Sequence, residues 1–117
     1  VNEKMAEFIN PIAILGDQMT KFTTEIGFKG MQNPDEVGAA AVDYLRVAGH
    51  LVFGYLFARM AQVSLRAIAN GSTDPFYTAK LQTARFYFAK LFPETVLLMR
   101  TARAGSKVLM DTDAALA

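Results

Sequence analysis

The chain has 117 residues, which is enough for one domain with a core of its own. Hydrophobic residues make up 52% of it, charged residues 20%, and the net charge is +1, so the composition argues against nucleic-acid binding and suggests that some apolar surface meets a partner. The sequence contains no cysteine, which excludes disulfides, thiolate metal sites and cysteine nucleophiles and favours a cytoplasmic location.

The first periodic segment predicts an amphipathic helix, because apolar residues recur every three or four positions as far as Ile26. Pro11 would remove a hydrogen bond from the interior of this helix. The helix therefore either starts with Asn10 as its cap or continues with a kink, and we favour a start near Asn10, with residues 1–9 as a lead-in or an extension of the helix. Because the chain begins with Val1, we expect it to be a piece of a longer protein.

A second helix is predicted after a connection that contains Gly27–Gly30, where two glycines tolerate positive φ. The run Asn33–Glu36 has the features of a helix start: a cap, a first-turn proline and acidic residues. No further proline intervenes before Asn70–Ser72, so this helix reaches about 36 residues.

The middle of the second helix is apolar nearly all round, which is typical of a helix with neighbours on several sides. Its longest apolar run, Val47–Ala58, contains His50 and lies between two arginines. A membrane-spanning helix needs about twenty apolar residues. The run therefore predicts the central helix of a bundle and no transmembrane segment.

A third helix is predicted to begin at Asp74-Pro75 and to continue to about residue 104. Pro93 either breaks or kinks it, and Gly105 ends it. Residues 107–110 can add a turn. The residues expected on its core face are Leu81, Ala84, Phe88, Leu91, Leu98, Met99 and Ala102.

These segments predict an all-α fold, an antiparallel bundle of three long helices, or of four if the break near Pro93 divides the third. The bundle domain spans residues 10–110. Residues 111–117 form a flexible tail in this interpretation.

Few residues are candidates for chemistry. His50 is the only histidine, so a histidine-rich metal site cannot form, and we expect no metal site and no catalytic residue in this chain. Asp43, Arg46 and His50 are three and four residues apart and share one helix face. They can form an acid–base site around the histidine or a polar seam between helices, and we favour the seam.

Aromatic and basic side chains allow a second pair of interpretations. Phenylalanines and tyrosines between residues 53 and 88 suit either a flat ligand or core packing, and helical spacing favours packing. Lys80, Arg85 and Lys90 can meet phosphate, but their angular spread favours a solvated face.

Two stretches resemble a known family. They are Asp74–Phe88 with Leu91–Thr95, and Tyr44–Arg46 with Gly54–Ala61. The first is similar to the closing helix, and the second to the central helix, of a C-terminal domain found in bacterial acyl-CoA dehydrogenases. The resemblance covers most of residues 34–110, and residues 1–30 match only in helical character.

The resemblance implies a parent enzyme of the fatty acid β-oxidation type, which binds FAD and removes hydrogens from the α and β carbons of an acyl-CoA. Its glutamate base and flavin contacts lie in a catalytic core outside this chain, so no catalytic or cofactor-binding residue is assigned here. The helical domain is expected to pack on that core and to support a homo-oligomer. The alternatives are an independent oligomerisation module and a module that binds a hydrophobic ligand.

A second apolar face of the third helix is a candidate interface. Phe86 and Leu97 lie on it, nearly opposite the core face, together with Ala79 and Pro93. We expect Phe86 and Leu97 to contact either the parent's catalytic core or a second copy of the chain.

Overall fold

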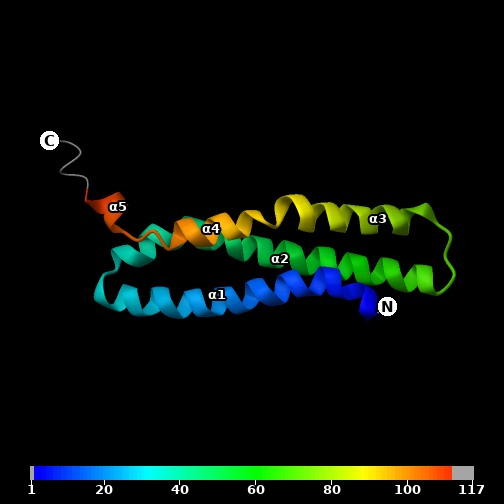
Figure 1. The fold of residues 1–117 in the computed structure, drawn as a ribbon, viewed down its shortest axis with the longest axis horizontal. Helices are drawn as coiled ribbons and strands as arrows, with labels where there is room; N and C mark the ends of the chain where they lie inside the picture. Colours follow the sequence, from blue (N-terminus) through cyan, green and yellow to red (C-terminus); the bar gives the residue numbers. More distant parts are fainter. Residues whose placement is uncertain (1, 112–117) are drawn as a thin grey trace.

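The computed structural model describes residues 2–111, and all the regular elements in that range are helical (Figure 1). This confirms the predicted all-α bundle of three long helices. A short 3₁₀ turn, Glu3–Met5, leads into α1. The helices are α1 (Ala6–Gln32), α2 (Asp35–Ala69), α3 (Pro75–Phe86), a π-helical turn (Tyr87–Leu91), α4 (Glu94–Ala102) and α5 (Lys107–Met110).

Helix α2 lies between α1 and the third helix, which consists of α3, the π-helical turn and α4 (Figure 1). The molecule is elongated and measures 68 × 27 × 14 Å along its principal axes. Two ion pairs, Arg85 with Glu7 and Arg103 with Glu25, join the third helix to α1, and in both the partners are 78 residues apart. The constant offset shows that these two helices run parallel and meet over one face of α2.

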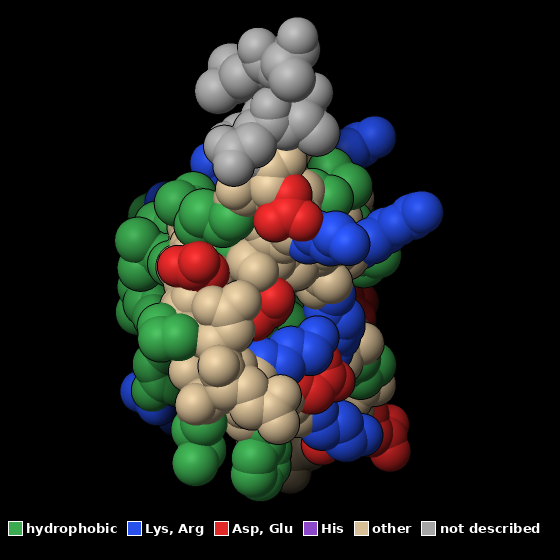
Figure 2. Space-filling model, turned by 90° about the vertical axis from the view of Figure 1, so that its left-hand side faces the viewer, with side chains coloured by type: hydrophobic (Ala, Val, Ile, Leu, Met, Phe, Trp, Pro, Cys, Tyr) green, Lys and Arg blue, Asp and Glu red, His purple; other side chains and the backbone are tan. Residues whose placement is uncertain are grey.

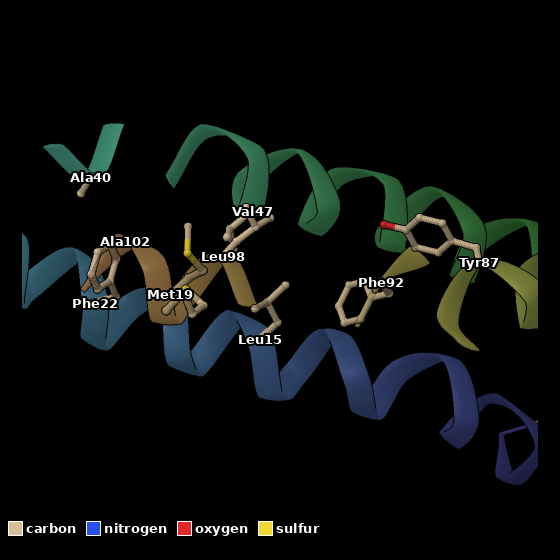
Figure 3. Packing of buried hydrophobic residues seen from close by; sticks show 10 residues of the cluster. Leu15, Met19, Phe22, Ala40, Val47, Tyr87, Phe92, Leu98 and Ala102 are labelled. Carbon is tan, nitrogen blue, oxygen red and sulfur yellow. The ribbon is translucent and has the colours of Figure 1, made fainter. Parts of the chain in front are cut away.

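The core consists of two clusters between these three helices. One cluster, shown in Figure 3, brings Leu15, Met19 and Phe22 of α1 against Val47 of α2 and residues of the third helix. The other lies near the chain's N-terminal end, where Phe8 packs with Met5, Ala58, Ala61, Leu65, Leu81 and Ala84. Small residues of α2 let its two neighbours approach closely. A methyl group at Gly54 would lie 3.2 Å from Phe92 and 3.3 Å from Ile12.

The face of α2 that points away from the core is uncovered, although α1 and the third helix flank α2 on two sides. Val42 is 78% exposed and Leu45 is 74% exposed, although both lie well inside α2. Seen from one end in Figure 2, hydrophobic side chains line one side of the molecule and charged ones gather on the other. This uneven distribution is the first indication that the domain has a partner.

The prediction that the first helix starts near Asn10 is wrong, because α1 begins at Ala6 and passes through Pro11. The proline removes one backbone hydrogen bond, at a cost of about 3 kcal/mol. Burial offsets this cost, since Phe8 and Met5 are only 1% and 5% exposed. Fully burying two such side chains contributes about 3 to 6 kcal/mol.

The end of α1 also differs from the prediction, because Gly27–Gly30 remains helical and neither glycine has a positive φ. Gly30 instead permits close packing, since a methyl group there would lie 2.5 Å from a methyl group of Val37. The helix stops at Gln32. As predicted, Asn33 caps the next helix, and its Oδ1 accepts a hydrogen bond from the backbone of Asp35 at 3.1 Å.

The third helix begins as predicted, with Oδ1 of Asp74 accepting from the backbone N–H of Phe76 at 3.0 Å. It is interrupted before Pro93, where the backbone N–H of Phe92 donates to the carbonyl of Tyr87 at 2.9 Å and closes a π-helical turn. This wider turn adds one residue to the helical repeat. Phe92 and Tyr87 therefore point into the core (Figure 3), and Leu91, predicted to be buried, is 48% exposed.

The chain beyond α4 turns at Gly105, which has a φ of 87° and ends the helix as predicted. The expected extra turn is α5. The predicted tail, residues 111–117, lies outside the described residues except for Asp111.

One helix among residues 2–111 passes a test of length and composition for crossing a membrane, namely α2. Its most apolar window of 18 residues has a mean hydropathy of 1.2, and 28% of that window is buried within the chain. Core helices of soluble proteins pass the same test. Helix α2 contributes to both core clusters, although less than a third of this window is buried within the chain.

Candidate functional site

Polar residues line one side of the contact between α2 and the third helix. On α2 they are Glu36, Asp43, Arg46 and His50, and on the third helix and the turn after it they are Tyr87, Glu94, Thr101 and Ser106. We call this set the polar ladder. Because the two helices are antiparallel, residues seven apart on one, such as Asp43 and His50, face residues seven apart on the other.

At one end of the polar ladder the contacts are hydroxyl–carboxylate hydrogen bonds. The hydroxyl of Ser106 donates to Glu36 at 2.6 Å, and that of Thr101 donates to Asp43 at 2.9 Å. These bonds fix the register of α2 against α4 and the turn that follows it. They are charge-assisted, which makes them stronger than bonds between neutral groups.

The other end of the polar ladder is a network around His50. Arg46 forms an ion pair with Glu94, whose other carboxylate oxygen lies 3.5 Å from Nε2 of His50. On the far side of the ring, Nδ1 lies 2.8 Å from the hydroxyl of Tyr87. The Tyr87 hydroxyl also donates to the backbone carbonyl of His50 at 3.1 Å, so this one side chain contacts both the ring and the main chain of His50.

The electrostatics of this network follow from these contacts. The hydrogen bond from Arg46 is the main reason why the pKa of Glu94 lies below its usual range. The same bond raises the pKa of the Arg46 guanidinium. Burial, followed by the nearby Glu94 carboxylate, raises the pKa of Tyr87 to about 12, so its hydroxyl stays neutral at physiological pH.

A hollow of about 420 Å³ opens beside the network, between α2 and the π-helical turn. Phe53 and Leu91 form its apolar walls, and both are about half exposed. The polar side chains at its edge, Arg46, His50 and Glu94, are already paired with one another.

The chemistry available to this site is restricted. A hydroxyl with a raised pKa is a poor base and a poor nucleophile, and Tyr87 is also 4% exposed. Among residues 2–111, no group of three or more His, Asp or Glu side chains is arranged to hold a metal ion. The network is therefore better suited to fixing two helices than to transforming a substrate.

The sequence identified one half of the polar ladder. It placed Asp43, Arg46 and His50 on one face, and the structure shows each of them paired with the third helix rather than with the other two. Tyr87, Glu94 and Thr101 were missed as partners. Their spacing of seven matches that of Glu36, Asp43 and His50, and this match is the signal that could have identified them.

The predicted interface residues lie on the exposed side of the third helix. Phe86 is 58% exposed and Leu97 is 60% exposed, and Ala79 and Pro93 are exposed as well. The aromatic cluster divides in two. Phe57 stacks on Tyr87 with ring centroids 4.4 Å apart, whereas Phe53 and Phe76 remain over half exposed.

The N-termini of the longer helices are poor sites for the pyrophosphate of FAD. A helix N-terminus binds an anion through its free backbone N–H groups, and a carboxylate beside them competes with that anion. Each of the four longer helices has an acidic residue in its first turn or as its N-cap: Glu7, Asp35, Asp74 and Glu94. The N-termini of these helices therefore carry negative charge where a pyrophosphate would need positive potential.

Comparison with known proteins identifies the domain. No curated protein shows a significant match to the chain. A family model described as acetyl-CoA dehydrogenase C-terminal like matches residues 1–113, which is nearly the whole sequence. Because the match covers far more than half of the chain, the chain belongs to the acetyl-CoA dehydrogenase C-terminal-like family.

Proposed function

We propose that this chain is the non-catalytic C-terminal domain of an FAD-dependent acyl-CoA dehydrogenase of the fatty acid β-oxidation type. In this proposal it packs on the catalytic core and supports assembly of a homo-oligomer in the cytoplasm. The family match supplies the link to acyl-CoA dehydrogenases. The cysteine-free sequence supports the location.

The observation that carries the proposal is the contrast between paired polar groups and uncovered apolar groups. In the part of the chain that the structure describes, no buried side-chain nitrogen or oxygen lacks a hydrogen-bond partner. Large apolar side chains such as Val42, Leu45 and Leu97 are at least 60% exposed. A domain built in this way offers contact surface rather than reactive groups.

Two exposed apolar faces are available, and they lie on different helices. One is the outer face of α2, and the other is the face of the third helix that contains Phe86 and Leu97. A domain that joins a catalytic core to a second subunit needs two separate surfaces. We assign the face with Phe86 and Leu97 to the catalytic core.

The test is to purify the full-length polypeptide that contains this chain and, separately, residues 1–117. We expect the full-length protein to show flavin absorbance near one FAD per chain and to reduce an artificial electron acceptor when acyl-CoA is added. Residues 1–117 alone are expected to show neither property. Flavin bound to residues 1–117, or a full-length protein without dehydrogenase activity, would contradict the proposal.

A control separates this function from that of a ligand-binding module. If the hollow beside Phe53 and Leu91 binds a hydrophobic small molecule, mass spectrometry of denatured residues 1–117 will detect it after purification. Substituting Phe53 with Ala would then reduce its yield. Neither result is expected if the domain serves assembly.

A further inference from the structure

A regular stripe runs along the uncovered side of α2. Its positions alternate by four and three residues, as in the a and d positions of a coiled coil. We call it the outer stripe: Asp35, Gly38, Val42, Leu45, Gly49, Val52, Leu56, Arg59, Val63 and Arg66. The positions that pack inside the domain, including Ala40, Val47, Gly54 and Ala61, form a separate stripe with the same spacing of seven.

The outer stripe has no function within the chain. Its aliphatic side chains, Val42, Leu45, Val52, Leu56 and Val63, are between 54% and 78% exposed. A soluble helix with no partner on that side would carry polar residues there.

The glycines of the outer stripe support the same conclusion. A methyl group built at Gly38 or Gly49 would meet nothing within 4 Å, so neither glycine is needed for packing inside the domain. Glycine in a helix interior costs about 0.5 to 1 kcal/mol relative to alanine. Small residues at such positions allow another helix to approach closely.

The spacing identifies the partner as an α-helix, and the order of residue types indicates a second copy of α2 running antiparallel. In antiparallel pairs, each a position faces a d position of the other helix. If the twofold axis lies between Gly49 and Val52, these two residues face each other across the pair. Leu45 then faces Leu56, and Val63 faces Gly38, so large side chains fill the space beside small ones.

Charges at the ends of the outer stripe agree with this register. Asp35 of one copy faces Arg66 of the other, at both ends of the pair. Arg59 faces Val42, where its aliphatic stem can pack while the guanidinium reaches solvent. In a parallel pair, Asp35 would instead face Asp35 of the other copy and Arg66 would face Arg66. Both contacts would be repulsive.

We propose that two copies of this chain associate through the outer stripes of α2, antiparallel, with Leu45 of each packed against Leu56 of the other. This proposal takes from the proposed function only the claim that the domain supports assembly. The surface and the register of the dimer are what it adds. The pair is isologous, so it closes as a dimer.

The test is disulfide cross-linking in the full-length polypeptide, with the unmodified protein as a control for cysteines outside residues 1–117. We expect the double variant Leu45→Cys/Leu56→Cys to form a covalent dimer under mild oxidation. Each single variant should not, because two equivalent positions then lie about 16 Å apart along the pair. Within one chain the two cysteines are equally far apart, so an internal disulfide cannot replace the intermolecular one.

A second substitution checks that the outer stripe causes the association. In the double-cysteine background, Val52→Glu places two carboxylates beside the twofold axis, and we expect the covalent dimer to decrease at least tenfold. The matched control is Val96→Glu, on an exposed valine of α4 outside the stripe, which should cross-link like its parent.

The other outcomes overturn the proposal. Cross-linking by the single variant Leu45→Cys would indicate a parallel pair. No cross-linking in a folded protein would mean that the catalytic core, a membrane or solvent covers the stripe. Flavin content, measured in the same samples, tests the proposed function separately. If the protein contains flavin but does not cross-link, only the proposed dimer is contradicted. If the protein cross-links but has no dehydrogenase core, only the assignment as an enzyme domain is contradicted.

Discussion

Glu94 is the residue that joins the parts of the polar ladder, because its two carboxylate oxygens contact Arg46 and His50 on α2. It also lies in the first turn of α4, where a negative charge is favourable. Its pKa is lowered in the folded state, chiefly by the hydrogen bond from Arg46. The ordinary pKa of a glutamate side chain is 4.5. As the pH falls toward this value, the unfolded chain therefore binds more protons than the folded chain.

We predict that acid destabilises the domain partly through this residue. The stability that Glu94 contributes is present above the pKa of this side chain in the unfolded chain. It is lost as the pH falls through the lower pKa that Glu94 has in the folded chain. Urea unfolding at several pH values between about 6 and 3 should show stability falling with pH, and the fall should be shallower in Glu94→Gln. Glu3→Gln, at an exposed position, is the control. Equal slopes in Glu94→Gln and the unmodified protein would contradict the prediction.

His50 and Tyr87 allow a second prediction at this scale. We expect His50→Ala and Tyr87→Phe each to lower the free energy of unfolding by at least the roughly 0.5 to 1.5 kcal/mol that is typical of one hydrogen bond, because both remove the bond between the ring and the hydroxyl. His50→Ala also removes the contact with Glu94, and Tyr87→Phe also removes the bond to the His50 carbonyl. The double variant should lose less than the sum, since both changes remove the same bond. Turnover of the full-length enzyme should stay nearly intact. A loss of turnover by orders of magnitude in a folded His50→Ala variant would place this residue in the chemistry.

The hydroxyl of Tyr87 can also be followed directly. The chain has four tyrosines, and Tyr87 is the one whose pKa is raised to about 12. In an alkaline titration followed by ultraviolet absorbance, we expect one tyrosine to ionise only near pH 12, and this late step should disappear in Tyr87→Phe. A late step that persists in the variant would belong to another tyrosine.

At the scale of elements, the close packing of three helices depends on Gly54. The methyl group of an alanine there would already press on Phe92 and Ile12, and a valine side chain is larger and stiffer. We predict that Gly54→Val lowers stability by about 1 to 3 kcal/mol through overpacking. Gly16→Ala, in open space on α1, should raise stability by about 0.5 to 1 kcal/mol. Thermal melting of both variants checks this, and a Gly54→Val variant as stable as the parent would refute it.

The elements themselves were largely predictable, since α2 and the start of α3 follow from caps, prolines and an apolar period that act locally. The errors occurred where tertiary contacts override local preference. Burial of Phe8 carries α1 through Pro11, and the π-helical turn before Pro93 rotates Leu91 out of the core. Half of the polar ladder was missed for the same reason. Its partners on the third helix come from 37 to 58 residues away, and only the antiparallel register brings them together.

At the scale of the whole molecule, α1 and the third helix are drawn together over one face of α2 by ion pairs and by cation–π contacts. The guanidinium carbon of Arg103 lies 5.2 Å from the centre of the Phe22 ring, and that of Arg85 lies 5.8 Å from the centre of the Phe8 ring. The packing of α1 and the third helix over α2 buries the inner faces of all three helices. The outer face of α2 and the second face of the third helix then remain for partners.

The last prediction concerns that second face, where Phe86 and Leu97 are over half exposed and touch no core cluster. We predict that Phe86→Asp and Leu97→Asp weaken the contact with the catalytic core strongly, because an unpaired charge in an apolar contact is costly. In residues 1–117 alone, thermal melting should change little. In the full-length protein, limited proteolysis should release the domain faster, and the melting of the two parts should separate. The control is Ile14→Asp, on an α1 residue that is 60% exposed like Leu97. If both variants behave like the control, this face is not an interface; if both unfold the domain alone, Phe86 and Leu97 belong to its own core.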